Sequence, residues 1–388
     1  MSQKTLRFGI IGLGLMGKEF ASAVARWCHL LDNSLPKPII SGICDNNNTE
    51  ARNWFTRNFD NIKVNSTDYN DLLSSSDIDA IYCAVPHHLH KTIYTDIIRS
   101  GKHLLGEKPF GIDLRSNEEI LQEIRKRNDL KVRCSSEFPF FPGAKRVIEF
   151  IRSEEYGQLI EVKCGFHHSS DMDLSKPVNW KRIVKFNGEY GCMGDLGLHT
   201  HHIPLRMGWK PKWIFADLQK IAETRPDGNG NIVPCDTWDN AVITSKCTDP
   251  VNNKDFTLVL ETKRMAPGQT NTWFIEVYGT KGSVKFSTRD PKSFFYLKPT
   301  KNEQGWTRVD IGSQSFIPSV TGGIFEFGFS DAFQQMIAAY VREFSDVNPQ
   351  HPFHTVTPEE THLSHIIMNA SLDSYKTGQR ININYYKL

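Results

Sequence analysis

The chain has 388 residues, and its 46 Lys and Arg residues nearly balance its 44 Asp and Glu residues, giving a formal net charge of +2. This balance excludes the concentrated basic surface that nucleic-acid-binding proteins need. The length predicts two domains, and a hydrophobic content of 39% is enough for ordinary cores. No apolar run reaches the roughly 18 residues of a membrane span, so we expect no transmembrane helix and no membrane partner.

The segment near the N-terminus, FGIIGLGLMG, is apolar but rich in glycine. It predicts a strand that runs into a loop rather than a signal peptide. The eight cysteines are scattered without a C-x-x-C pair, and several lie in apolar strand-like runs, where reduced, buried cysteines are common. Together these features predict a cytoplasmic protein.

Short apolar runs alternate with helical patterns along the first third of the chain. Strands are expected at residues 5–11, 38–45, 79–86 and 102–109. Helices are expected at residues 18–31, 49–59, 90–101 and 116–128. This alternation predicts an α/β domain with a parallel, doubly wound sheet, and we place the domain at residues 1–131.

The pattern changes after residue 131, where apolar and polar residues alternate as in strands with one buried face and one solvent-exposed face. Such strands are expected at residues 157–169, 240–247, 256–264 and 271–287, the last with a hairpin turn at Gly-Thr-Lys-Gly. Residues 223–236 predict an exposed loop, and residues 357–377 a closing helix that packs back near the first domain. We therefore expect a second, α+β domain over residues 132–388 with an open, mostly antiparallel sheet.

A G-x-G-x-x-G motif joins the first expected strand to the first expected helix. In this context the glycines permit a tight turn, a close approach to a pyrophosphate and close packing of helix on strand. The alternative is a glycine-rich turn that binds nothing. We expect five residues of the motif to contact a dinucleotide: Gly12, Gly14, Leu15, Met16 and Gly17.

Asp45 ends the second expected strand. A carboxylate there accepts hydrogen bonds from the adenosine ribose and repels a 2′-phosphate, which favours NAD over NADP. NADP stays open, because Arg52 lies close enough in sequence to serve a phosphate. Asp45 could also be a simple turn residue beside three asparagines.

Glu107, Lys108 and Pro109 stand at the carboxyl end of a buried strand, the edge at which open α/β sheets bind ligands. A lysine held there can bind a substrate hydroxyl and stabilise developing alkoxide charge. The alternative is a solvated lysine at the start of a loop. Two more residues, Pro86 and His90, follow another strand at this edge. They either line the nicotinamide side of the cleft or simply belong to a surface loop.

The segment GDLGLHTHHIP raises a choice between a metal site and an acid–base pair. On a helix Asp195 and His199 share a face, so the aspartate can orient an imidazole that takes a proton near neutrality. His199 and His202 also share a face, and three ligands would suit a catalytic zinc. No H-E-x-x-H and no further ligand is evident, so we expect no metal. Satisfied structural histidines remain an alternative.

These motifs, in this order, resemble the glucose–fructose oxidoreductase/inositol dehydrogenase family, Gfo/Idh/MocA. The matching segments are GIIGLGLMG, AVPHHLH, GKHLLGEKP, NWKR with GEYGCMGDLGLH, and VYGTKGSVKF. The resemblance implies a Rossmann fold, a C-terminal domain often used for oligomerisation, and catalytic roles for Lys108, Asp195 and His199. It implies cofactor contacts also at Ala84, Glu107 and Lys108. His199 would accept the hydroxyl proton while hydride passes to nicotinamide.

The sequence departs from the family pattern around the substrate pocket. His202 replaces a frequent aspartate, the segment SSEFPFFPG replaces an asparagine–arginine segment, and Tyr190 interrupts a glycine run. Trp180, Lys181 and Arg182 border the same region. Six side chains are expected to contact substrate: Glu137, His167, Trp180, Arg182, Tyr190 and His202.

The leading functional hypothesis is an NAD-dependent dehydrogenase that acts on a secondary hydroxyl of a sugar, glycoside or cyclitol. Such an enzyme binds a small-molecule sugar or polyol as its substrate. We also expect a homo-oligomer, either a dimer or a tetramer. A redox-neutral, glycosidase-like enzyme that retains NAD is the first alternative. A non-enzymatic sensor is the second, although a sensor needs no proton acceptor.

Overall fold

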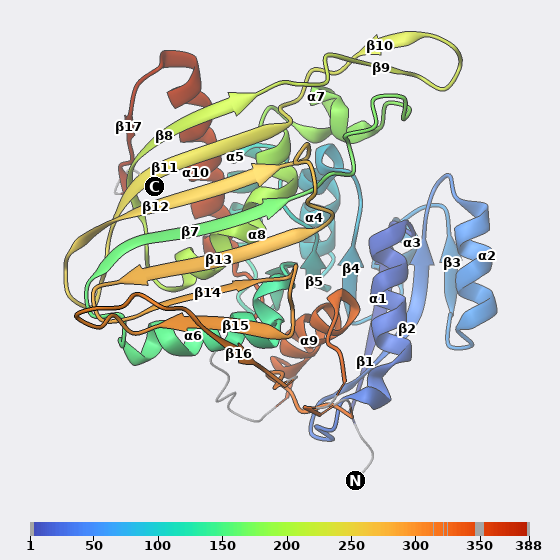
Figure 1. The fold of residues 1–388 in the computed structure, drawn as a ribbon. Coiled ribbons are helices and arrows are strands. Elements are labelled where there is room, and N and C mark those ends of the chain that lie inside the picture. Colours follow the sequence, from blue (N-terminus) through green and yellow to red (C-terminus); the bar gives the residue numbers. More distant parts are fainter. Residues whose placement is uncertain (1–3, 313, 321, 324, 346–352, 386–388) are drawn as a thin grey trace.

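The computed structural model describes residues 4–312, 314–320, 322–323, 325–345 and 353–385. Two large sheets dominate the molecule, a parallel sheet from the first third of the chain and a larger sheet from the remainder, and a small two-stranded sheet accompanies them (Figure 1). Over the described ranges, no helix combines the length and the apolar character needed to cross a membrane.

The six strands of the first sheet are all parallel and lie in the order β3-β2-β1-β4-β5-β6. Strand order reverses between β1 and β4, which opens a crevice at the carboxyl ends where ligands bind in such sheets. The strands are β1 (Thr5–Ile11), β2 (Lys37–Cys44), β3 (Val64–Ser66), β4 (Ala80–Cys83), β5 (His103–Gly106) and β6 (Val132–Cys134).

Helices connect these strands and cover the sheet, so the expected doubly wound fold is confirmed. Apolar runs such as Phe8 and Ile10 are fully buried, as strands covered on both faces require. The connecting elements are α1 (Leu15–Ala25), η1 (Trp27–His29), α2 (Thr49–Asn58), α3 (Asn70–Ser74), η2 (His87–Leu89), α4 (His90–Arg99) and α5 (Leu114–Arg125).

The second sheet has nine strands in the order β16-β15-β14-β13-β7-β12-β11-β8-β17. Only β7 and β12 run parallel; the other neighbours are antiparallel, as the alternating pattern predicts. The strands are β7 (Leu159–His167), β8 (Pro211–Gln219), β11 (Asn240–Thr248), β12 (Asp255–Lys263), β13 (Thr272–Gly279), β14 (Ser283–Ser287), β15 (Ser293–Leu297), β16 (Thr307–Asp310) and β17 (Ile381–Asn382).

Helices pack on one face of this sheet, between it and the parallel sheet, and leave the other face uncovered (Figure 1). The central helix is α8, which contacts β7, β11 and β12. The elements of this domain are η3 (Phe138–Phe140), α6 (Pro142–Ser153), η4 (Trp180–Arg182), α7 (Val184–Asn187), α8 (Cys192–Arg206), α9 (Phe329–Arg342) and α10 (Pro358–Thr377).

The end of the chain returns to the first domain. Helix α10 lies against α5, where Asn117 Nδ2 donates to Thr361 Oγ1 at 2.9 Å. Helix α9, which was not among the expected helices, packs on α1, where Gln334 Nε2 donates to the backbone oxygen of Ala23 at 3.0 Å. The parallel sheet also continues through β6, just beyond the expected boundary at residue 131.

One expected loop contains regular structure. Within residues 223–236, β9 (Thr224–Pro226) pairs with β10 (Ile232–Pro234) as a two-stranded hairpin. The buried Arg225 on β9 donates to the backbone oxygens of Asp171 and Asp173, at 2.5 and 2.6 Å. The hairpin therefore holds the segment before η4, which lines the cleft described below.

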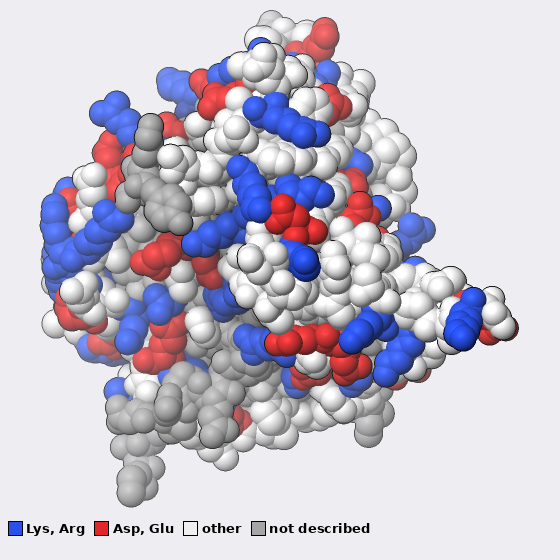
Figure 2. Space-filling view, turned by 90° about the vertical axis from the view of Figure 1, so that its left-hand side faces the viewer, with Lys and Arg blue, Asp and Glu red and all other residues white. Residues whose placement is uncertain are grey.

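Charged side chains of both signs are interspersed on the side of the molecule shown in Figure 2, and neither sign covers it continuously. All eight cysteines are free; seven of them are buried and Cys28 is exposed. Their scattered placement agrees with the thiols expected from the sequence.

Candidate active site

A cleft of about 1640 Å³ runs from the glycine loop along the carboxyl edge of the parallel sheet to helix α8. It collects most of the motifs that were singled out in the sequence. The predicted residues that line it are Gly12, Gly14, Leu15, Met16, Asp45, Ala84, Pro86, Glu107, Lys108, Glu137, Trp180, Asp195 and His199.

The glycine loop has the shape of a phosphate cradle. Gly12 has φ +91°, and a Cβ there would lie 2.3 Å from the backbone oxygen of Ala84. A Cβ on Gly17 would lie 2.3 Å from the backbone oxygen of Gly12, so Gly17 serves helix packing and does not line the cleft. A Cβ on Gly14 would meet nothing within 4 Å. The open space beside the start of α1 fits a dinucleotide pyrophosphate.

Asp45 ties the second strand to the glycine loop. Its Oδ2 accepts from Leu13 N at 3.0 Å, and its Oδ1 accepts from the backbone of Asn47 and Asn48 at 3.2 and 3.1 Å. Arg52 donates to the backbone oxygen of Asp45 at 3.0 Å. Asp45 thus acts as a turn residue and still lines the cleft where the ribose of a dinucleotide would lie.

His90 supports the cleft from behind and does not line it. Its ring stacks on Tyr94 with centroids 4.7 Å apart, and its Nε2 lies 3.0 Å from the backbone oxygen of Val85. Burial lowers the pKa of His90 to about 3, so the ring is neutral. It fixes the backbone between Ala84 and Pro86, which does line the cleft.

Lys108 points at helix α8. Its Nζ donates to Asp195 Oδ1 at 2.7 Å and to the Asp195 backbone oxygen at 2.6 Å. The following bond, to Pro109, is cis, and the buried Glu107 accepts a hydrogen bond from Tyr82 at 2.7 Å. Burial alone would lower the pKa of Lys108, but Asp195 and Glu107 outweigh it and raise that pKa, so Lys108 is a cation.

Asp195 has three cationic neighbours. Besides Lys108, Lys181 Nζ lies 3.1 Å and Arg264 Nε 3.4 Å from its Oδ2. Burial alone would raise the pKa of Asp195, but the three cations hold it well below the ordinary value of 3.8. Asp195 is therefore a permanent anion that fixes the direction of the Lys108 side chain.

His199 follows Asp195 by one turn of α8, as the spacing predicts. Its Nδ1 lies 3.2 Å from Ser136 Oγ, and the rings of Phe138 and Phe166 contact it edge-on. Burial, and then the charge of Lys108, hold the pKa of His199 well below 6.5. The imidazole is therefore neutral and able to accept a proton, while Ser136 orients the ring.

The later histidines of α8 diverge from the cleft. His201 Nδ1 lies 2.8 Å from Ser364 Oγ, and the His202 ring packs on Phe353 with centroids 4.6 Å apart. Across the residues that the structure describes, no cluster of three or more His, Cys, Asp and Glu side chains could hold a metal ion.

The six side chains expected at the substrate fall into two groups. Glu137 and Trp180 line the cleft. His167 lies on the opposite face of β7, beside Glu261, because neighbouring strand residues alternate; His168 faces the cleft instead. The other three lie outside the lining, where Arg182 pairs with two aspartates, Tyr190 packs on His365 and His202 packs on Phe353.

Some groups of the site were not identified from the sequence. Ser136 and Arg264 contact His199 and Asp195, and Phe166 and Phe329 line the cleft. Ser136 directly precedes Glu137 within a segment already noted for its departure from the family, which is the one local signal. The others are distant in sequence and ordinary in type.

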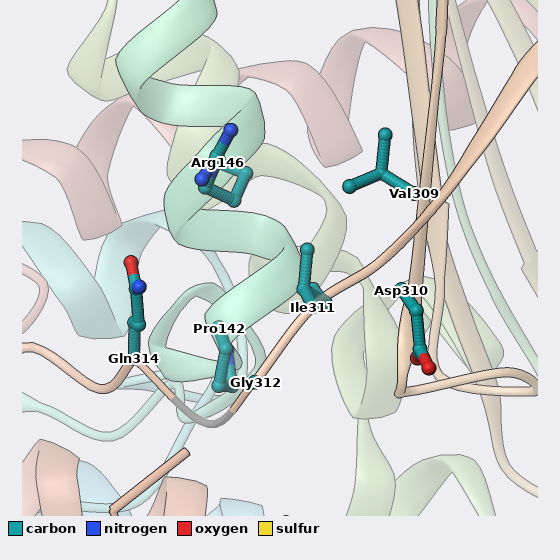
Figure 3. A pocket seen from close by; sticks show the side chains of 7 residues that line it. All are labelled: Pro142, Arg146, Val309, Asp310, Ile311, Gly312 and Gln314. Atoms are coloured by element: carbon teal, nitrogen blue, oxygen red, sulfur yellow. The ribbon is translucent and has the colours of Figure 1, made fainter.

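A second, smaller hollow of about 110 Å³ lies between the start of α6 on one side and the end of β16 with the residues that follow it on the other (Figure 3). None of its lining residues belongs to the large cleft. They are Pro142, Arg146, Val309, Asp310, Ile311, Gly312 and Gln314.

A dinucleotide cradle that opens onto a lysine, an aspartate and a neutral histidine defines an NAD-binding oxidoreductase. Comparison with known sequences agrees with this class. The model of the Gfo/Idh/MocA oxidoreductase family, with an NAD-binding Rossmann fold, matches residues 6–134, and the model of its C-terminal domain matches residues 144–285. The chain belongs to this family.

Individual relatives span most of the chain. The uncharacterized oxidoreductase YrbE of Bacillus subtilis is 30% identical, over 77% of this chain and 83% of the relative. Levoglucosan dehydrogenase of Pseudarthrobacter phenanthrenivorans is 22% identical, over 80% and 81%. A solved levoglucosan dehydrogenase, in complex with NADH and L-sorbose, has the same fold, with a TM-score of 0.85 and 18% identity over 98% of this chain and 100% of that one.

Proposed function

We propose that this NAD-dependent oxidoreductase oxidises a secondary hydroxyl of a sugar, glycoside or cyclitol, with Lys108, Asp195 and His199 as its catalytic groups. The observation that carries the proposal is the placement of these groups on one cleft with the glycine loop. Relatives named levoglucosan dehydrogenase and, from Bacillus subtilis, glucose-6-phosphate 3-dehydrogenase support the substrate class.

Each group has a distinct task. Lys108, a cation aimed by Asp195, holds the substrate oxygen and stabilises the negative charge that develops as its proton leaves. The neutral His199 accepts that proton. When bound, NAD supplies the hydride acceptor. Glu137 and Trp180 border the substrate from the cleft wall.

We infer that the cofactor is NAD rather than NADP. Asp45 lines the cleft at the end of β2, where a 2′-phosphate would meet its carboxylate. The side chain of Arg52 is engaged by the Asp45 backbone and by Thr49, at 3.0 and 3.2 Å, so it is held back from serving a phosphate.

Absorbance at 340 nm tests the function. Purified protein is mixed with NAD or with NADP against a panel of sugars, glycosides and inositols, and products are analysed in the same samples. We expect NADH to accumulate with one substrate class, and NADP to support a rate at least about tenfold lower because the Asp45 carboxylate repels its extra phosphate.

Two other outcomes would contradict the dehydrogenase. Product without net NADH would favour a redox-neutral, glycosidase-like reaction. Sugar and NADH binding without any product would favour a sensor. The largely buried Lys108–Asp195 pair argues against the sensor, because desolvating two charges is costly and binding alone does not require it.

We also propose that the uncovered face of the nine-stranded sheet joins two copies of the chain. Phe215 on β8 is 44% exposed there, and the nearby Val242 and Val259 lie on the same face. An open sheet face with apolar residues is a common self-association surface. Light scattering after gel filtration should show a homo-oligomer for the wild type and a smaller species for Phe215→Lys. A monomeric wild type at micromolar concentration would contradict this proposal.

A further inference from the structure

Lys181 is a second lysine at the catalytic carboxylate. Its Nζ lies 3.1 Å from Asp195 Oδ2, on the oxygen that Lys108 does not use. Its side chain is 41% exposed and lines the cleft, whereas the Lys108 side chain is 17% exposed. A lysine ammonium has three N–H donors, and among the described residues Asp195 takes only one of those of Lys181. The other two are left for a ligand of the cleft that Lys181 lines.

The inner cleft has more positive than negative charge. The single negative charge of Asp195 is surrounded by the three positive charges of Lys108, Lys181 and Arg264. Counting Glu107 as ionised still leaves an excess of one positive charge, and the ring of oxidised nicotinamide adds another.

Two further carboxyl groups of the cleft, Glu137 and Asp171, do not remove this excess. Burial raises the pKa of Glu137 to about 8, so this side chain is mostly neutral at pH 7. Asp171 and Asp239 both pair with the buried Arg182. The buried Arg225 donates to the backbone oxygen of Asp171, so these two carboxylates and two guanidinium groups carry no net charge together. Burial lowers the pKa of Lys181. Lys108 and Arg264 lower it further, against the opposite effect of Asp195.

We propose that Lys181 binds a negatively charged substituent of the substrate, a carboxylate or a phosphate, so that the preferred substrate is an acidic sugar. The proposal rests on the function proposed above and names its substrate class. An anion at Lys181 would complete the charge balance around Asp195 and leave Lys108 free to hold the reacting oxygen. Charge-assisted hydrogen bonds of this kind are about twice as strong as neutral ones.

Trp180 supports this placement. It precedes Lys181 in η4, lines the same cleft, and its ring centroid lies 5.8 Å from Lys181 Nζ. An aromatic ring beside a cation can cover the apolar face of a sugar while the cation takes the acidic group. The segment is held in place by Arg182, which pairs with Asp171 and Asp239.

The test compares acidic sugars with neutral sugars of the same ring. D-glucuronate and glucose 6-phosphate are compared with glucose, and D-galacturonate with galactose, by kcat/KM with NAD. Binding is followed in parallel by the thermal shift of the NADH-loaded protein. We expect the kcat/KM of at least one acidic sugar to exceed that of its neutral partner about tenfold. The same acidic sugar should also raise the unfolding temperature of the NADH-loaded protein more than its neutral partner does. The uronate and phosphate arms distinguish the two anions.

Lys181→Gln should reduce this acidic-to-neutral ratio about tenfold, and Lys181→Arg should restore most of it. Lys185→Gln is the matched control, because Lys185 is exposed in the same segment and does not line the cleft. The ratio is the readout because Lys181 also contacts Asp195. A purely structural effect of the substitution would lower kcat/KM equally for acidic and neutral sugars and leave their ratio unchanged.

Equal loss with both substrate types, or a wild-type preference for the neutral sugars, would overturn the proposal. Absence of NADH from every sugar would instead count against the proposed function. In that event the thermal-shift comparison of uronate, phosphate and neutral sugar still decides the anion site.

Discussion

Replacing Lys108 with methionine is expected to lower kcat by about 10²- to 10³-fold, the usual effect of removing a donor to a developing oxyanion. The reason is that Lys108 is a largely buried cation on the cleft that also contains the glycine loop, and its Nζ is held 2.7 Å from Asp195 Oδ1. Steady-state rates with the best substrate from the 340 nm panel measure the loss. NADH binding, followed by fluorescence, should stay within about twofold, because the cradle at Gly14 is untouched.

The fold of this variant can be checked independently. Asp195 keeps Lys181 and Arg264 as partners when Lys108 is removed, so its charge is not left buried alone. Thermal unfolding of Lys108→Met should therefore remain cooperative, and Lys91→Met, at an exposed helix lysine paired with Glu119, is a matched control. A Lys108→Met enzyme with near wild-type kcat would remove Lys108 from the catalytic groups.

Local sequence motifs were sufficient to predict most of the fold and the residues at the centre of the site. Glycines at fixed spacing after a strand, a lysine at a strand end, and two residues one helical turn apart all depend on neighbours in the chain. The structure places Gly14, Lys108, Asp195 and His199 on one cleft. The parallel sheet was predictable for the same reason, since each strand and helix is a continuous run with its own periodicity.

Contacts between distant segments could not be predicted in this way. Ser136 meets His199, and Arg264 meets Asp195, across 63 and 69 residues of chain. A serine at a strand end and an arginine after a β-strand are ordinary residues until the fold brings them to a buried partner. Helix α9 (Phe329–Arg342) is a different case, because it is a continuous run with a local helical pattern and was nevertheless not among the expected helices.

The end of β7 shows how a shift of one residue along a strand changes which side chain reaches the cleft. His167 and His168 are adjacent, and only the side of β7 that meets α8 decides which of them reaches the cleft. His168 shares its parity with the buried Phe166, and His167 shares its parity with Lys163 on the uncovered face. The sequence showed both parities, and the three-dimensional position of α8 was needed to select one.

Replacing His199 with asparagine is expected to lower kcat by about 10²- to 10⁴-fold, the range for loss of a general base. Asparagine preserves a polar group beside Ser136 but cannot accept the proton. In the wild type, the pKa of His199 lies below 6.5 because burial and Lys108 oppose its charged form. A base must be unprotonated, so activity is retained at pH 6.5 and is lost only as the pH falls through that lower pKa.

The pH profile of kcat/KM measures this pKa in the free enzyme. We expect the acid limb of the wild type to lie below pH 6.5, and the residual activity of His199→Asn to lack that limb. His201→Asn is a control from the same helix, since His201 bonds Ser364 away from the cleft. An acid limb that persists in His199→Asn would assign the titration to another group. A wild-type limb above pH 7 that disappears in His199→Asn would contradict the lowered pKa of His199. A limb above pH 7 that persists in the variant would point to another group, such as Glu137, whose pKa is raised by burial to about 8.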